Sequence, residues 1–164
     1  MNSWRPFGSC NNLRGTDGTA FKPNVKDSDT LYVFETMLCK IFKFQNDDSV
    51  TKSSKLRGIK SKRFYLTPDN YNRELPNACH CWEDSLDDCP AVQLNIRFCG
   101  VADHLMNLIA STPYFFPYKS ELQVNTSQEV PLDYTYENYG TFVDVEPVSY
   151  KIYNFVLVLI RKIQ

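Results

Sequence analysis

The sequence lacks a strong charge of either sign, a long apolar run and an apolar N-terminal segment. Its net charge is −1 over 164 residues, which gives no electrostatic basis for binding nucleic acid or an anionic membrane surface. The longest strongly apolar run covers 155–160, far short of the roughly 20 residues that a membrane-spanning helix needs. The first residues also lack the apolar core of a signal peptide. We expect no nucleic-acid partner, and neither anchor nor leader within this sequence.

The sequence is also poor in the motifs of enzymes. It contains no G-x-S-x-G nucleophile motif. The turn at 15–19 lacks the lysine of a phosphate-binding loop. Two histidines are present, and His80 lies inside a cysteine cluster, where it is poorly placed to activate a nucleophile. We predict that the protein is not an enzyme and uses no cofactor.

What the sequence does contain is six cysteines, an even number that is typical of a disulfide framework. A single residue separates Cys79 from Cys81, whereas paired zinc ligands usually leave about two to four, so disulfides are favoured over zinc. The sequon at Asn125 favours the secretory pathway and predicts an N-glycan on an exposed turn. The alternative is a set of reduced core cysteines. Disulfides without a leader are explained most simply if the sequence is a fragment of a longer membrane-anchored protein.

Aromatic residues make up 14% of the chain, which favours strands over helices. The segment 30–44 combines helical spacing of apolar residues with good strand formers, so we expect a short helix or a helix–strand mix there. The polar segment 46–62 is expected to be a solvated loop, including its basic run. Strands are predicted at 63–67, at 141–146 and, as one long buried strand, at 151–163. The fold class is α+β, mainly β, in a single partial domain over 1–164.

Seven segments, in order, resemble motifs of the class B scavenger receptor family, which includes croquemort-type receptors, sensory neuron membrane proteins and lysosomal integral membrane proteins. They are 15–23 (GTDGTAFKP), 31–39 (LYVFETMLC), 57–64 (RGIKSKRF), 77–81 (NACHC), 111–115 (STPYF), 140–147 (GTFVDVEP) and 161–164 (RKIQ). Each motif is weak alone, but seven in the right order make a specific match. Tyr114 departs from the family, which has a histidine there.

The resemblance implies the C-terminal part of an irregular antiparallel β-barrel-like ectodomain with short helices. Two transmembrane anchors and the ligand-binding apex of such receptors would lie outside this chain. The implied function is that of a cell-surface scavenger receptor, on the extracellular side of the plasma membrane or in the lysosomal membrane. Its implied ligands are lipids, fatty acids and lipoprotein-like particles, carried toward the bilayer through an apolar tunnel.

The resemblance also supplies site residues. It implies three disulfides, Cys10–Cys79, Cys39–Cys99 and Cys81–Cys89, a choice that spacing alone cannot make. The candidates for the wall of a lipid tunnel are Phe115, Phe116, Tyr153 and Phe155, and ordinary core packing is the alternative for each of them.

Three rival interpretations stay open. The first is a piece of a sensory neuron membrane protein that handles lipidic odorants or pheromones. The second is a small secreted interaction module stapled by disulfides, and the third is a nonfunctional truncated product. Because the remaining strands of the implied barrel would come from elsewhere in a longer protein, we also expect these residues alone to fold poorly and to bind lipid weakly.

Overall fold

The structure is a computed structural model, and it describes residues 12–36, 38–46, 54–56, 59–71, 93–95, 108–117, 133–148, 152–156 and 162–163. The strands are β1 (Thr30–Glu35), β2 (Lys40–Gln45), β3 (Ser54–Leu56), β4 (Ile59–Leu66), β5 (Gln93–Asn95), β6 (Leu108–Ser111), β7 (Phe142–Val145), β8 (Ile152–Val156) and β9 (Lys162–Ile163). The short helices are η2 (Pro68–Tyr71), η5 (Pro113–Phe115) and α2 (Tyr136–Tyr139).

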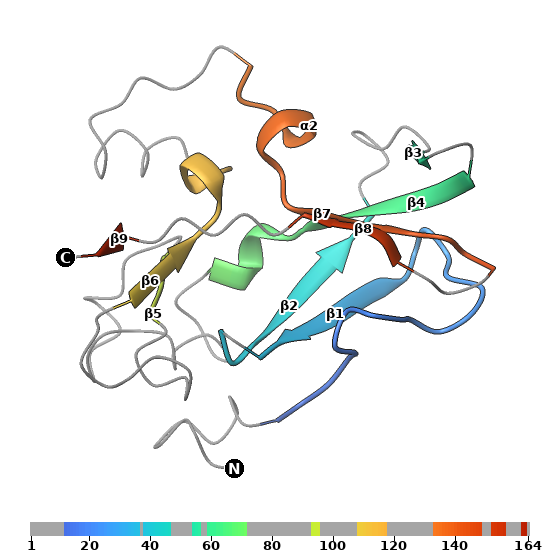
Figure 1. Cartoon of the computed structure of the whole chain (residues 1–164), viewed down its shortest axis with the longest axis horizontal. Coiled ribbons are helices and arrows are strands. Elements are labelled where there is room, and N and C mark those ends of the chain that lie inside the picture. The colour runs from blue at the N-terminus through green and yellow to red at the C-terminus, as the bar shows by residue number, and fades with distance from the viewer. Residues whose placement is uncertain are drawn as a thin grey trace.

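Two antiparallel sheets carry the fold. The larger has the order β1-β2-β4-β7-β8, with β3 paired to the outer part of β4, and the smaller has the order β5-β6-β9. Strand direction turns across the larger sheet, so that this sheet curls, and α2 and η5 lie at one end of it (Figure 1). The prediction of a mainly β, antiparallel, barrel-like fold with short helices is confirmed.

The helix expected within 30–44 is wrong, because this segment is the hairpin of β1 and β2. Leu31 faces Phe44 and Val33 faces Phe42 across the hairpin, and all four side chains are buried. The helical spacing of the apolar residues was coincidental. Burial alternates along both strands, and cross-strand pairs of aromatic and β-branched side chains stabilise that arrangement.

The solvated loop expected over 46–62 is wrong in its second half. β3 and the first residues of β4 form a hairpin there, in which Ser54 faces Ser61 and Leu56 faces Ile59. Lys60 and Ile59 are exposed in this part of β4, while Phe64 and Leu66 are buried further along. β4 therefore begins at the surface and ends in the core. Its first residues are mostly polar and do not show the alternation of apolar and polar residues that predicts a strand. The strand predicted at 63–67 is confirmed.

The strand predicted at 141–146 is confirmed as β7. The single long strand expected over 151–163 is wrong, since β8 pairs with β7 in the larger sheet and β9 pairs with β6 in the smaller one. The chain therefore passes from one sheet to the other within this apolar segment, a change that an unbroken apolar run does not reveal.

The segment before β1 covers the outer edge of that strand. Thr16 bridges to Val33 in parallel, with its N–H donating to the Tyr32 carbonyl at 3.1 Å and its carbonyl accepting from Phe34 N–H at 2.7 Å. Gly15 has φ +91°, and an added Cβ would lie 2.2 Å from the Tyr32 carbonyl oxygen. Glycine is therefore required for this close approach.

The core lies on the inner face of the larger sheet and receives Leu94 and Ala110 from the smaller one. Its largest fully buried apolar side chains are Phe42, Phe44, Phe64, Leu38, Val25, Val33, Val143 and Val145. No helix in the described segments is long and apolar enough to span a bilayer. Nor, within those same segments, do three or more His, Cys, Asp or Glu residues gather as they would to hold a metal ion.

Candidate functional site

The candidate site lies where the two sheets meet. The end of β4 and the start of β7 come from the larger sheet, and the turn after β6 comes from the smaller one. α2 lies over this junction (Figure 1), and aromatic side chains fill it.

A buried ion pair fixes β4 against β7 beside the junction. Arg63 and Asp144 are direct cross-strand partners, and the guanidinium donates two hydrogen bonds of 2.8 Å to the carboxylate. The Asp144 side chain is 0% exposed and the Arg63 side chain 20%. These hydrogen bonds raise the pKa of Arg63 above its ordinary value, and its guanidinium carbon lies 3.6 Å from the centroid of the Phe142 ring. Both charges are thus satisfied, and the pair holds β4 against β7.

The Asn70 side chain, in η2, makes the hydrogen bonds to β2 that a neighbouring strand would otherwise make. Its Oδ1 accepts from Lys43 N–H at 2.8 Å, and its Nδ2 donates to the Lys43 carbonyl at 2.8 Å and to the Thr67 carbonyl at 2.7 Å. The side-chain amide thereby copies the two hydrogen bonds of a neighbouring peptide group. Thr67 N–H also donates to the Lys43 carbonyl, at 3.1 Å. The chain can therefore leave β4 at this point without exposing the backbone of β2.

Lys40, at the start of β2, is 4% exposed. Burial lowers the pKa of its amine from 10.5 to about 7, and the charge of Asp69 opposes that change. The amine lies 5.9 Å from the centroid of the Phe42 ring. A lysine in this state titrates near neutral pH, which makes it a source of pH-dependent stability.

Seven aromatic side chains form a continuous series of ring contacts across the junction, which we call the aromatic cluster. Its members are Tyr65, Phe142, Tyr136, Phe116, Tyr134, Tyr139 and Tyr114, with centroid separations between 4.7 and 6.1 Å. Most of the contacts are edge-to-face, the arrangement that aromatic pairs prefer. Because the members come from β4, β7, α2, the turn after β6 and the segment before α2, the cluster joins the two sheets.

Tyr134 fixes the outer part of the cluster. Its hydroxyl donates to the Tyr114 carbonyl at 3.0 Å, and burial raises the pKa of Tyr134 to about 12. Tyr114 itself has positive φ and is 43% exposed. The phenol therefore stays neutral at physiological pH and acts as a hydrogen-bond donor.

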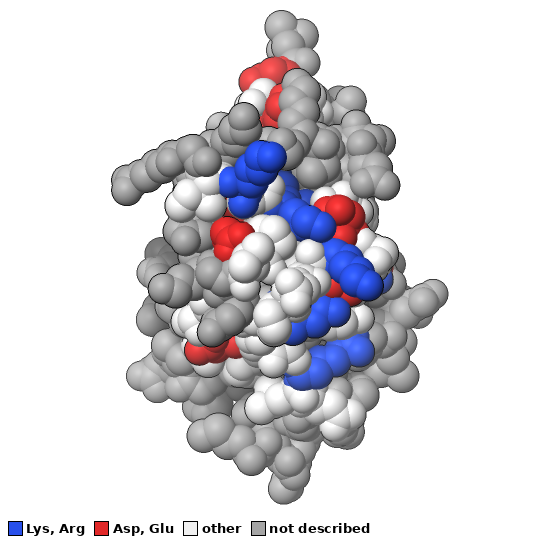
Figure 2. All heavy atoms as spheres, turned by 90° about the vertical axis from the view of Figure 1, so that its right-hand side faces the viewer, with Lys and Arg blue, Asp and Glu red and all other residues white. Residues whose placement is uncertain are grey.

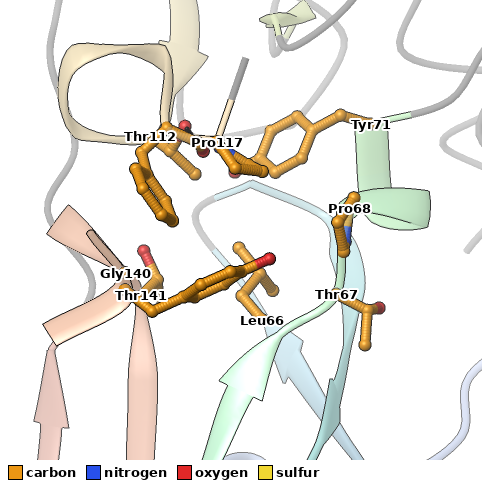
Figure 3. A pocket seen from close by; sticks show the side chains of 10 residues that line it. Leu66, Thr67, Pro68, Tyr71, Thr112, Pro117, Gly140 and Thr141 are labelled. Carbon is orange, nitrogen blue, oxygen red and sulfur yellow. Dashed lines mark hydrogen bonds between the residues drawn. The ribbon is translucent and has the colours of Figure 1, made fainter. Parts of the chain in front are cut away.

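Two openings flank Tyr136 and the end of β4. The outer groove, about 480 Å³, is lined by Lys43, Gln45, Asn46, Tyr65, Leu66, Thr67, Pro68, Asp69 and Tyr136. The inner cavity, about 10 Å³, is lined by Leu66, Thr67, Pro68, Tyr71, Thr112, Phe116, Pro117, Tyr136, Gly140 and Thr141. Figure 3 shows that Thr112, Pro117 and Tyr71 lie on one side of the inner cavity and that Leu66 and Thr141 lie on the other.

The two openings differ in chemistry. The outer groove has a charged rim, where Lys43 Nζ lies 2.8 Å from Asp69 Oδ2. Apart from its hydroxyl groups, the inner cavity is bounded by aliphatic, aromatic and proline side chains. The groove falls in the size range of small-molecule sites, which is about 300–1,000 Å³, and the cavity does not.

Charged side chains cover another face of the molecule. Figure 2 shows lysine and arginine side chains running along it with acidic side chains between them. Ion pairs on the described surface include Lys22 with Asp29 at 2.9 Å and Lys62 with Asp27 at 3.0 Å. The alternation of sign is typical of a solvated surface and differs from a continuous basic patch for nucleic acid.

The structure describes some of the residues predicted from sequence. Phe115 packs against the core, and Phe116 is buried within the aromatic cluster. Cys39 lies in the turn between β1 and β2 and is disulfide-bonded, but its partner is outside the described residues. Tyr153 and Phe155 belong to β8, and their side chains are outside the description. The remaining predicted residues, Cys10, Cys79, Cys81, Cys89, Cys99 and Asn125, are also outside it, so the pairing and the glycan stay predictions.

Sequence reasoning missed the ion pair, the Asn70 contacts and the tyrosines of 134–139. A signal existed for the first, because Asp144 is a charged residue within an otherwise apolar strand, and buried charges are rare unless paired. None existed for the tyrosines, which lie in a polar segment and meet Phe116 and Tyr114 only in the folded chain.

Comparison with known proteins places the chain in a family. A family model described as the CD36 family matches residues 1–151. Sensory neuron membrane protein 1 of Bombyx mori is 32% identical over 91% of this chain and 26% of its own length. The proteins of the same name in Mamestra brassicae and Ostrinia furnacalis are 31% and 30% identical, each over 89% of this chain and 25% of their own length. The chain thus spans about a quarter of the length of the curated relatives it matches. With a family match over 151 of its 164 residues, the chain belongs to the CD36 family, the class B scavenger receptors.

Proposed function

We propose that this chain forms part of the extracellular domain of a membrane-anchored receptor that binds lipids or lipoprotein-like ligands and transfers lipid toward the bilayer. The observation that carries the proposal is the aromatic cluster at the junction of the sheets, which borders the outer groove through Tyr65 and Tyr136. Family membership supports it. Anchors in the rest of the receptor would hold the domain at the plasma membrane.

The proposed role is non-enzymatic and needs no cofactor. Moving an acyl chain from water to an apolar wall is favourable by about 0.8 kcal/mol per buried CH2 group, so transfer requires apolar surface rather than a reacting group. Tyr136 would supply such surface, because it lines the outer groove and packs against Tyr65 and Phe116.

The proposal is tested with a fluorescent fatty acid and the full-length protein. Tyr136→Ala should weaken binding several-fold, because it removes aromatic surface that lines the outer groove. Val148→Ala is the control, because Val148 is 74% exposed and lines neither opening. Equal affinity of wild type and Tyr136→Ala, with both proteins folded, would argue against a lipid contact in the outer groove.

A second candidate function is favoured by the relatives, which are named as sensory neuron membrane proteins. In that setting the receptor would handle lipidic odorants or pheromones in chemosensory neurons. An antibody to this chain should then label sensory neurons and their dendrites. Labelling confined to phagocytic or gut cells would instead favour debris clearance or lipid uptake.

A further inference from the structure

The inner cavity contains a hydroxyl group that no protein atom satisfies. Thr141 is 4% exposed, and its Oγ1 has no hydrogen-bond partner. Its backbone is held in place, because its carbonyl accepts from Leu66 N–H at 2.8 Å. A buried polar atom without a partner is rare in folded proteins, since it loses the hydrogen bonds that water gives it in the unfolded chain. This hydroxyl therefore points to a bound hydrogen-bonding group.

The opposite wall of the cavity offers a second hydroxyl. Thr112 is also 4% exposed, and its Oγ1 donates its one proton to the Phe116 carbonyl at 2.7 Å. A hydroxyl that has donated its proton still has acceptor capacity, and the Thr141 hydroxyl has both a proton and acceptor capacity. Thr112 follows β6 in the smaller sheet and Thr141 precedes β7 in the larger one (Figure 3). A group bound between them would link the two sheets.

The volume of the inner cavity limits which molecule can bind in it. The space of about 10 Å³ is close to the minimum that holds one water molecule, about 10–15 Å³, and is far below that of a sugar or an acyl chain. Buried waters need about two to four polar partners, and the two threonine hydroxyls meet that requirement. We propose that the inner cavity is a hydration site, in which one internal water molecule donates to Thr112 Oγ1 and hydrogen-bonds to Thr141 Oγ1, linking the two sheets.

The site is independent of the proposed lipid role. The water stabilises the junction that holds the aromatic cluster and takes no part in ligand transfer. Loss of the water should therefore lower thermal stability without abolishing lipid binding at temperatures where the protein is folded.

The test combines a structure of the full-length protein, at a resolution that shows ordered solvent, with thermal unfolding of variants. Thr141→Val replaces the hydroxyl with a methyl group of the same shape, and Thr141→Ser keeps the hydroxyl. Thr135→Val is the matched control, because Thr135 is exposed and its side chain makes no capping hydrogen bond.

We expect one solvent oxygen within hydrogen-bonding distance of both hydroxyls in the wild type and in Thr141→Ser, and none in Thr141→Val. The Tm of Thr141→Val should fall by roughly 2–4 °C relative to Thr135→Val, because the water's hydrogen bonds are lost. A wild-type cavity without solvent density would overturn the proposal. So would a Tm of Thr141→Val equal to or above that of the control, since removing a hydroxyl that was merely unpaired relieves its cost.

Discussion

Arg63 donates two hydrogen bonds of 2.8 Å to Asp144 at a point where the carboxylate has no exposure to water. The pair joins β4 to β7, the two strands through which β1–β2–β4 and β7–β8 meet in the larger sheet. Removing Arg63 takes two hydrogen bonds from a fully buried carboxylate, which costs far more than the pair itself contributes.

Arg63→Ala should therefore destabilise the protein by about 3–5 kcal/mol, measured by urea unfolding. The double replacement Arg63→Met with Asp144→Leu should cost much less, because neither charge is left behind. Lys62→Met on the same strand is the control. Its ion pair with Asp27 is at the surface, with side chains 29% and 57% exposed, so its loss should cost no more than about 1 kcal/mol. A small effect of Arg63→Ala alone would show that water reaches Asp144.

Asn70→Ala should destabilise the protein by about 1–3 kcal/mol, because the N–H and carbonyl of Lys43 both lose a hydrogen-bond partner in a partly buried place. Asn70→Asp should also be destabilising, because a carboxylate can accept from Lys43 N–H but cannot donate to its carbonyl. Asn12→Ala, at an exposed position, is the control. Equal unfolding midpoints for the Asn70 and Asn12 variants would mean that β2 does not depend on the side-chain amide.

Lys40 should make stability depend on pH. Its pKa is about 7 in the folded protein, against 10.5 as the ordinary value. Between these values the unfolded chain binds more protons than the folded one, so stability rises with pH. Below about pH 7 both states are protonated, and the full cost of the buried charge is present.

The difference between wild type and Lys40→Met isolates this effect, with Lys26→Met as an exposed control. From pH 7 to 9, wild type should gain stability relative to Lys40→Met, with a slope approaching about 1.4 kcal/mol per pH unit. At pH 6 the methionine variant should be the more stable protein. Parallel curves for the two proteins would mean that the amine stays charged in the folded state and is paired there.

How far the sequence predicts this fold depends on the pattern of apolar and polar residues in each strand. β7 and the end of β4 alternate or concentrate apolar residues, and both were predicted. β1 and β2 have the same alternation, but Leu31, Phe34, Leu38 and Ile41 also match a helix, and only the cross-strand partners decide between the two. The polar start of β4 owes its strand form to pairing with β3, which no local pattern encodes.

The candidate site is harder to predict, because its parts are far apart along the chain. Phe116 meets Tyr134 and Tyr136, and Thr112 and Thr141 line the same cavity, only through the topology of the two sheets. The family resemblance indicated Phe115 and Phe116 as wall residues, but it gave no reason to expect an unpaired hydroxyl beside them. Contacts of this kind follow from packing rather than from a motif.

Peptide mapping without reduction should show the three bonds Cys10–Cys79, Cys39–Cys99 and Cys81–Cys89 in material from a secretory host. Cys39 is disulfide-bonded in the structure, which agrees with any pairing that uses it. The short loop closed by Cys81–Cys89 would contribute roughly 2.6 kcal/mol if the chain-entropy description holds. A Cys79–Cys81 bridge, or Cys39 joined to a cysteine other than Cys99, would contradict the pairing.

The last prediction concerns these 164 residues produced alone. They span about a quarter of the relatives' length, and among the described strands β8, at one end of the larger sheet, pairs only with β7. An edge strand whose partner would come from another part of the protein presents free backbone groups, and such edges favour aggregation. Disulfides restrict the unfolded chain but add no missing core.

We therefore expect the isolated segment to elute as aggregates in size-exclusion chromatography and to bind a fluorescent fatty acid weakly. The full-length protein in detergent should be monodisperse and should bind it well. Placing a lysine in β8, as in Asn154→Lys, should reduce aggregation of the segment, because a charge on an edge strand opposes strand addition. Asn12→Lys is the control for added charge alone. A soluble, monomeric segment that unfolds cooperatively and binds the fatty acid as tightly as the full-length protein would refute the prediction, since the sheet would then be complete within this quarter of the receptor.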